Sequence, residues 1–137
     1  MFKLKYENFQ NPMFQRSLAK LANFPGYASP KVSYGVAKIV KKITEEQKTF
    51  EKLYTDILKQ HAEMDENGNI KDDGKGVAVW KSEELKKQFE GKMKEFLDIE
   101  FEVPYGRLTL ADLGDLKLTP SEMIALESML NPMEGVK

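Results

Sequence analysis

The chain contains no cysteine, and this excludes disulfide bonds, thiolate metal sites and a cysteine nucleophile. Its absence is typical of proteins that stay in a reducing cytoplasm. No run approaches the roughly 18–20 apolar residues that a membrane helix requires, so we expect no membrane partner. Residues 1–6 alternate apolar with basic side chains and lack the apolar block of a signal peptide.

Complete catalytic, metal-binding and phosphate-binding motifs are also missing. The only histidine, His61, has no Ser or Thr nucleophile signature beside it, and we interpret it as a helix-surface or interface residue. Residues 65–69 resemble the start of a calcium loop, but Ile70 replaces its glycine and Gly76 its final glutamate. Gly74-Lys75-Gly76 begins a GxGxxG pattern that Val79 breaks. We predict no catalytic residue, metal or cofactor, and therefore no enzyme.

The charge is distributed unevenly along the 137 residues. Residues 1–50 hold nine Lys and Arg against three Asp and Glu, whereas residues 51–137 hold twelve against nineteen. Such asymmetry indicates an anionic partner for the basic part, or attraction between the two parts within one fold. The length and the 41% hydrophobic content fit a single domain, 1–137.

One long helix dominates the pattern. Val36, Ile43, Phe50, Ile57 and Met64 recur every seven residues, and Ser29-Pro30 supplies a cap and a first-turn proline. We predict a helix over 30–63, roughly 50 Å long. A turn over 65–81 follows, and a second helix over 82–98 packs antiparallel against the second half of the long helix.

The remaining elements complete an α+β fold. Alternation predicts strands over 2–7 and 99–103, and their basic and acidic outer faces favour pairing with each other. A third strand is expected over 107–110. Asn11-Pro12 and Thr119-Pro120 start helices over 12–23 and 120–130. The predicted architecture is a long antiparallel helical hairpin packed with a small antiparallel β-sheet and a short C-terminal helix.

The central part of the chain resembles an uncharacterised family of small tailed-phage proteins of unknown function, numbered 1617 among such families. The similarity lies in residues 39–42, 45–51 and 62–69, and it extends over roughly residues 30–103. The family's basic strand, long helix with polar turn and second helix correspond to residues 3–6, 29–68 and 82–98. The resemblance implies a phage protein in the host cytoplasm or associated with the virion. It supplies no catalytic residue.

A binding role follows from the length of the apolar stripe, which exceeds the helices that cover it. We expect Phe24, Tyr27, Val32 and Val40 to contact a viral or host protein, or a second copy of the chain. The alternative is a nucleic-acid-binding accessory protein that uses the basic side of the first half of the long helix. A third interpretation is that this basic side is simply solvated. Its residues are Lys31, Lys38, Lys41, Lys42 and Lys48.

Overall fold

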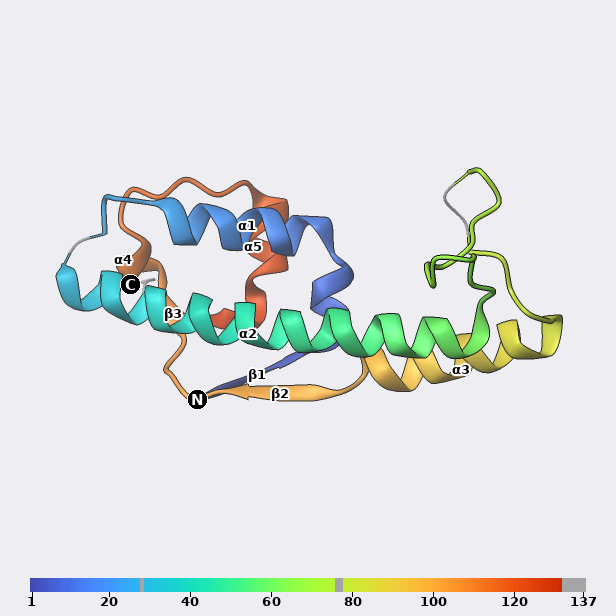
Figure 1. The fold of residues 1–137 in the computed structure, drawn as a ribbon. Coiled ribbons are helices and arrows are strands. Elements are labelled where there is room, and N and C mark those ends of the chain that lie inside the picture. Colours follow the sequence, from blue (N-terminus) through green and yellow to red (C-terminus); the bar gives the residue numbers. More distant parts are fainter. Residues whose placement is uncertain (28, 76–77, 132–137) are drawn as a thin grey trace. The chain divides into compact units, whose positions relative to one another are not determined.

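The computed structural model describes residues 1–27, 29–75 and 78–131 and has the predicted α+β fold (Figure 1). Two compact units divide the chain. Unit 1 consists of Met1–Gln47 and Glu100–Lys137, and unit 2 of Lys48–Ile99. The helix α2, Pro30–His61, contributes residues to both. We describe each unit by itself, and the organisation of residues 1–137 as a single domain stays a prediction.

The sheet of unit 1 joins the two ends of the unit. Strand β1, Phe2–Lys5, pairs antiparallel with β2, Glu100–Val103. Lys3 lies opposite Glu102 and Lys5 opposite Glu100, which confirms that the basic and acidic strands pair. Their other faces, which carry Phe2, Leu4, Phe101 and Val103, are buried.

The predicted first strand is too long at its C-terminal end. Residues Tyr6–Gln10 form a 3-10 helix, η1, rather than a continuation of β1. Its Tyr6 hydroxyl donates to Glu46 on α2 (3.2 Å), and the Asn8 side chain donates back to the Lys5 carbonyl (3.1 Å). The Asn8 bond to the backbone competes with continuation of the strand. The alternating sequence pattern alone does not reveal this competition.

Helix α1, Pro12–Asn23, has the predicted bounds and packs against the C-terminal helices. The side chain of Asn11 accepts from the Met13 amide (3.0 Å) and caps α1 as expected. Phe14, Leu18 and Leu21 are buried on its inner face. Ser17 donates to the Glu122 carbonyl (3.3 Å) and joins α1 to α5, Pro120–Ala125.

Two predictions for the C-terminal part are confirmed only in part, because a strand and a helix form there but differ in pairing and in length. The third strand does not extend the sheet: β3, Leu108–Thr109, pairs in parallel with β4, Leu130–Asn131. Thr109 and Asp112 form a reciprocal capping box that starts a short helix, α4, at Leu110–Leu113. The helix predicted over 120–130 stops at Ala125 and is followed by a 3-10 turn, η2, at Glu127–Met129.

Helix α2 confirms the uninterrupted span, with a small difference at its end. It stops at His61 because Ala62 bridges to Trp80 and the Glu63 amide donates to the Val79 carbonyl (2.7 Å). Met64, the last member of the seven-residue rhythm, is therefore outside the helix and 45% exposed.

Unit 2 contains the predicted antiparallel helix pair. Ser82 caps α3, Glu83–Leu97, by accepting from the Leu85 amide (3.1 Å). Phe50 stacks on Phe96 with ring centres 5.2 Å apart. Residues Tyr54 and His61, further along α2, lie beside Phe89, nearer the start of α3. The reversed order of these contacts establishes the antiparallel direction.

The segment between α2 and α3, predicted as a turn over 65–81, contains backbone pairing as well as turns. Gly76 and Val77 lie outside the described residues. Backbone bridges join Ala62 to Trp80, Met64 to Ile70 and Asp72 to Ala78. Gly68 and Gly74 adopt positive φ angles of 79° and 85°, as the Asn-Gly and Asp-Gly turn dipeptides predict.

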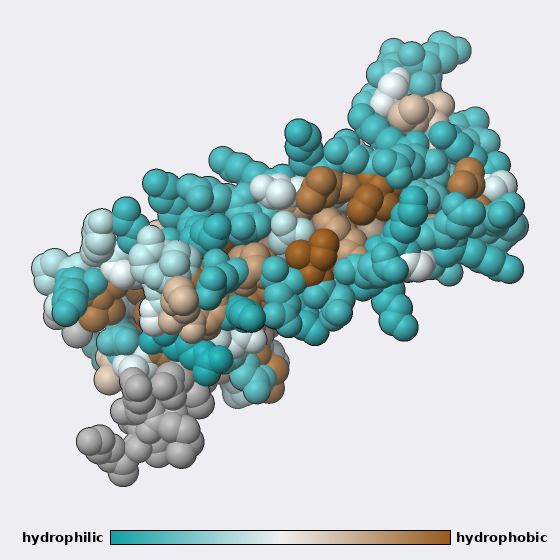
Figure 2. Space-filling view, turned by 90° about the horizontal axis from the view of Figure 1, so that it is seen from below, coloured by the Kyte–Doolittle hydropathy of each residue, from teal (hydrophilic) through white to brown (hydrophobic). Residues whose placement is uncertain are grey.

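Apolar side chains are not completely covered on the surface of the molecule (Figure 2). On the face drawn, apolar side chains lie between hydrophilic ones. In unit 2, Leu53 and Ile99 remain 39% and 44% exposed. None of the helices in the described part of the chain has the length and apolar character needed to span a bilayer.

Candidate functional site

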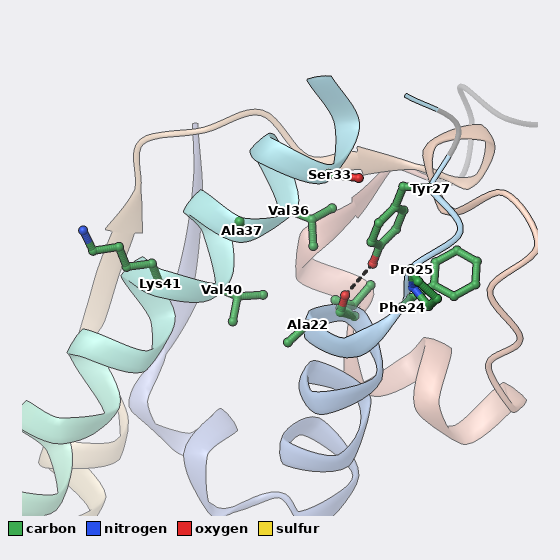
Figure 3. Close-up of a pocket in the computed structure, with 10 residues that line it drawn as sticks. Ala22, Phe24, Pro25, Tyr27, Ser33, Val36, Ala37, Val40 and Lys41 are labelled. Atoms are coloured by element: carbon green, nitrogen blue, oxygen red, sulfur yellow. Dashed lines mark hydrogen bonds between the residues drawn. The ribbon is translucent and has the colours of Figure 1, made fainter. Parts of the chain in front are cut away.

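A hollow of about 390 Å³ lies in unit 1 between the C-terminal end of α1 and the first half of α2 (Figure 3). Its volume is within the range of about 300–1,000 Å³ that is usual for ligand sites. Most of the side chains around it are apolar, with two hydroxyl groups and one ammonium group. The lining consists of Leu21, Ala22, Phe24, Pro25, Tyr27, Ser33, Val36, Ala37, Val40 and Lys41.

The segment that leaves α1 forms one wall of the hollow. Phe24 ends the helix with an extended backbone (φ −77°, ψ 120°), and its ring meets Tyr27 edge to face at 4.9 Å. The Tyr27 hydroxyl donates to the Leu21 carbonyl (2.7 Å), one of the carbonyls that a helix end leaves without an intrahelical partner (Figure 3). Desolvation raises the pKa of Tyr27 to about 12, so its hydroxyl stays neutral. The hydrogen bond to Leu21 holds the ring as part of this wall.

Small residues leave the space open. Ala22 on α1 and Ala37 on α2 both line the hollow and are exposed, whereas Val36 is buried beneath it. In Figure 3, Val36 and Val40 extend from α2 toward the α1 side, and Lys41 extends away with its amino group outward. A larger side chain at either alanine would fill part of this volume.

Three of the four predicted partner-binding residues line the same hollow. These are Phe24, Tyr27 and Val40. Val32 is half-buried but is not part of the lining, and its amide donates to the Ser29 side chain (3.2 Å) at the start of α2. Binding by these residues stays a prediction. Sequence reasoning missed Ala22 and Ala37, although two small residues on neighbouring helices are a signal for such a gap, and it assigned Lys41 only to the basic side of the long helix.

The basic residues predicted as a nucleic-acid surface have different environments. Lys42 pairs with Glu46 (3.1 Å), and the Lys38 ammonium lies 5.2 Å from the centre of the exposed Tyr34 ring. The hydrogen bond to Tyr34 raises the pKa of Lys38. Lys31 and Lys41 are exposed in unit 1, whereas Lys48 belongs to unit 2.

The part of the chain that borders the hollow is rich in basic residues, although the second half of α2 is also acidic. Residues 8–44 contain six Lys and Arg and no Asp or Glu. Within the described part of the chain, Lys41 at the rim makes no ion pair, so its charge is available to an anion. The rim of the hollow is therefore cationic at Lys41, whereas Lys42 is paired with Glu46.

Arg16 and Lys20 on α1 lie beside a buried carboxylate. Glu122 is 0% exposed, and its Oε1 accepts from Lys20 Nζ (2.7 Å) and from the Thr119 amide (2.9 Å). Arg16 Nε lies 3.8 Å from Oε2, an atom that accepts no hydrogen bond from the described residues. The Lys20 hydrogen bond, assisted by Thr119, lowers the pKa of Glu122 to about 2.

The cluster of Glu122, Lys20 and Arg16 has a structural role, because it joins α5 to α1. Thr119 was predicted to start this helix, but the burial of its capping partner Glu122 was not, because a capping box is usually exposed at a helix start. Both carboxylate oxygens of Glu122 face cations, and the negative charge holds α5 against α1.

His61 is buried at 2% exposure, so of its two predicted positions, helix surface or interface, the helix surface is wrong. Its Nδ1 lies 2.8 Å from the Ile57 carbonyl, and its ring lies 6.0 Å from Phe89. The packing of α3 and the bridge at Ala62 enclose it, and neither is visible in the local sequence.

The partial calcium loop forms a turn. Asp65 Oδ1 accepts from the amides of Asn67 (2.8 Å) and Asn69 (3.0 Å). No group of three or more potential metal ligands occurs among the residues that the structure describes. The aspartate that a calcium ion would need is used to shape the backbone.

Comparisons with protein-family models, curated proteins and solved structures found no match to this chain.

Proposed function

We propose that the protein is a non-enzymatic binding module that receives a short acidic segment of another protein in the unit 1 hollow. An apolar side chain of the segment would occupy the space beside Tyr27 and Val40. An adjacent carboxylate would approach Lys41. The partner is a viral or host protein, in keeping with the phage resemblance of residues 30–103.

One observation carries this proposal: an apolar hollow that has the exposed Lys41 at its rim and no carboxylate among its described lining residues. Complementary charge steers encounter and sets specificity, while apolar burial supplies most of the affinity. A hollow lined by Phe24, Tyr27 and Val36 favours a peptide over a purely phosphate-based ligand, which needs no apolar contact.

A random peptide display library selected on the whole chain tests the proposal. We expect enriched peptides that combine a bulky apolar residue with nearby Asp or Glu. Binding of a labelled enriched peptide is then measured by fluorescence anisotropy. Ala37→Leu fills the hollow without removing any existing contact, and it should weaken binding about tenfold, equivalent to the burial of roughly two methylene groups. Lys41→Glu should weaken it about twofold to fivefold, as expected for an exposed charge pair.

Matched controls separate the site from general effects. Ala19→Leu makes the same change at an exposed position of α1 outside the lining, and Lys92→Glu makes the same charge change on α3. Both should bind as the unaltered chain does. Selection of no peptide, or equal loss in the variants and their controls, would contradict the proposal.

Nucleic-acid binding is the second candidate, and the position of Tyr34 favours it. This ring is 64% exposed on α2 and lies against Lys38, an arrangement that suits stacking of an unpaired base. Lys31, Lys41 and Lys42 belong to the same basic stretch, and Lys48 follows it. A gel-shift series with single-stranded DNA would show affinity that falls steeply with salt and is reduced by Tyr34→Ala but not by Ala37→Leu. No shift at low salt would exclude this candidate.

A further inference from the structure

A second hollow, in unit 2, has a lining of a different chemical kind. Its volume is about 390 Å³, and it lies among the second half of α2, α3 and the segment between them that contains the backbone bridges, called here the bridged segment. Three of its seven lining residues are aromatic and one is a carboxylate. The lining consists of Tyr54, Leu58, Ile70, Asp72, Ala78, Trp80 and Phe89.

The aromatic rings are arranged around Phe89. Its centre lies 4.7 Å from that of Trp80 with the planes at 44°, and 6.4 Å from that of Tyr54 with the planes at 77°. All three side chains are half-buried, so part of each remains open to a ligand. Rings inclined to one another around a space present negatively polarised faces from different directions.

The backbone fixes Trp80 and Asp72 in place. Trp80 bridges to Ala62 at the end of α2, and the amide of Lys81 donates to the His61 carbonyl (3.1 Å). Asp72 bridges to Ala78, and its Oδ1 accepts from the Gly74 amide (2.9 Å). Because the bridged segment holds these residues before a ligand arrives, little ordering is required on binding.

Asp72 is the only charged residue among the described residues that line this hollow. A single carboxylate beside three aromatic rings attracts a positive charge and disfavours a negative one. The remaining lining is apolar, which suits a cation that carries methyl groups rather than a strongly hydrated ammonium.

We propose that this hollow, defined by Tyr54, Asp72, Trp80 and Phe89, binds a trimethylammonium group. The ring faces contact the methylated cation, Leu58 and Ile70 contact its methyl groups, and Asp72 balances its charge. This site lies in unit 2 and does not depend on peptide binding in unit 1. The same group occurs in free choline, in trimethylated lysine and in the phosphatidylcholine headgroup.

Trp80 is the only tryptophan of the chain and reports directly on the site. We expect choline chloride to change its fluorescence in a saturable way. The neutral analogue 3,3-dimethylbutan-1-ol, which replaces the ammonium nitrogen by carbon, should bind about tenfold more weakly, because it lacks the attraction to the rings and to Asp72. Equal responses to both compounds, or no saturable response to any of the trimethylammonium ligands named below, would overturn the proposal.

Variants distinguish recognition of the cation from simple apolar packing. Tyr54→Leu keeps an apolar wall but removes one ring, and it should raise the Kd for choline about fivefold to tenfold. Asp72→Asn keeps the acceptor for the Gly74 amide and removes the charge, and it should raise the Kd about threefold. Asp73→Asn, the same change next in sequence and outside the lining, is the control and should leave the Kd unchanged. If Tyr54→Leu does not fold, an unchanged Kd in Asp72→Asn overturns the proposal alone.

Three forms of the ligand identify its source. Trp80 fluorescence is titrated with choline, with a trimethyl-lysine peptide and its unmethylated counterpart, and with phosphatidylcholine and phosphatidylglycerol vesicles. The proposal predicts that at least one methylated form binds, and that Asp72→Asn weakens this binding. Preference for the unmethylated peptide or for phosphatidylglycerol would contradict it.

Discussion

The two units differ in how completely they bury their apolar side chains. Unit 1 contains seventeen of the buried apolar residues of the described chain, whereas unit 2 contains four, which are Phe50, Ala62, Met93 and Phe96. Unit 1 surrounds its core with helices, a sheet and a buried ion pair. Unit 2 consists of two helices and a bridged segment, with its aromatic cluster half open.

This difference separates two ways of forming a binding surface. In unit 1 the hollow lies beside a closed core, so the core stabilises it and the hollow contributes little to stability. In unit 2 two of the aromatic residues that line the hollow, Tyr54 and Phe89, also join α2 to α3. A ligand bound in either hollow stabilises the folded unit by mass action, by an amount set by its concentration relative to its Kd.

The largest expected effect on stability is that of Phe14→Ala. Phe14 is fully buried on α1 and meets Phe9 edge to face at 6.1 Å. Removing its ring should lower the free energy of unfolding by about 3–5 kcal/mol. Phe89→Ala, at a half-buried position in unit 2, should cost only about 1–2 kcal/mol. Urea unfolding measures both, and a larger loss for Phe89→Ala would reverse the comparison of the two units.

A smaller and pH-dependent effect is expected from Glu122. Its pKa in the folded chain is about 2, below its ordinary value of 4.5, so the folded state favours the carboxylate. The resulting stability is present above pH 4.5 and is lost as the pH falls from 4.5 toward 2. Glu122→Gln should be less stable at pH 7 and should not show this part of the acid loss.

Urea midpoints from pH 7 to pH 2.5 measure this difference. Glu127→Gln, an exposed change in the same region, is the control and should follow the unaltered chain. Parallel curves for Glu122→Gln and the unaltered chain would show that the ion pair with Lys20 does not stabilise the folded state.

The smallest effects are expected at the helix caps, one in each unit. Asn11→Ala removes the acceptor for the Met13 amide at α1, and Ser82→Ala removes that for the Leu85 amide at α3. Each should cost about 1 kcal/mol, with Asn11→Gly and Ser82→Gly costing less. If each unit unfolds separately, Ser82→Ala will lower the thermal stability of unit 2 only, as probed by Trp80 fluorescence.

Much of the architecture can be predicted from local sequence patterns. The caps at Asn11, Ser82 and Thr119 and the rhythm from Val36 to Ile57 place the helix starts and the continuous span of α2. Charge alternation at Lys3, Lys5, Glu100 and Glu102 was enough to pair β1 with β2. These signals are local or involve repeated, complementary residues.

The features that escaped prediction depend on contacts far apart in sequence. The burial of Glu122 requires Arg16 and Lys20 on another helix, and the pairing of β3 with β4 joins Leu108 to Leu130. The enclosure of His61 requires Phe89 and the Ala62–Trp80 bridge. For the candidate site, Phe24, Tyr27 and Val40 were identified from exposed apolar character, but the space between Ala22 and Ala37 appears only when the helices pack.

Amide hydrogen exchange along α2 tests the central claim most directly, because this helix contributes to both units. The closed core of unit 1 predicts that amides near Ile39 and Ile43 exchange only by global unfolding. The open packing of unit 2 predicts that amides near Tyr54 and Leu58, together with those of α3, exchange about tenfold to a hundredfold faster through local opening. Uniform protection along α2, or stronger protection in its second half, would contradict this account.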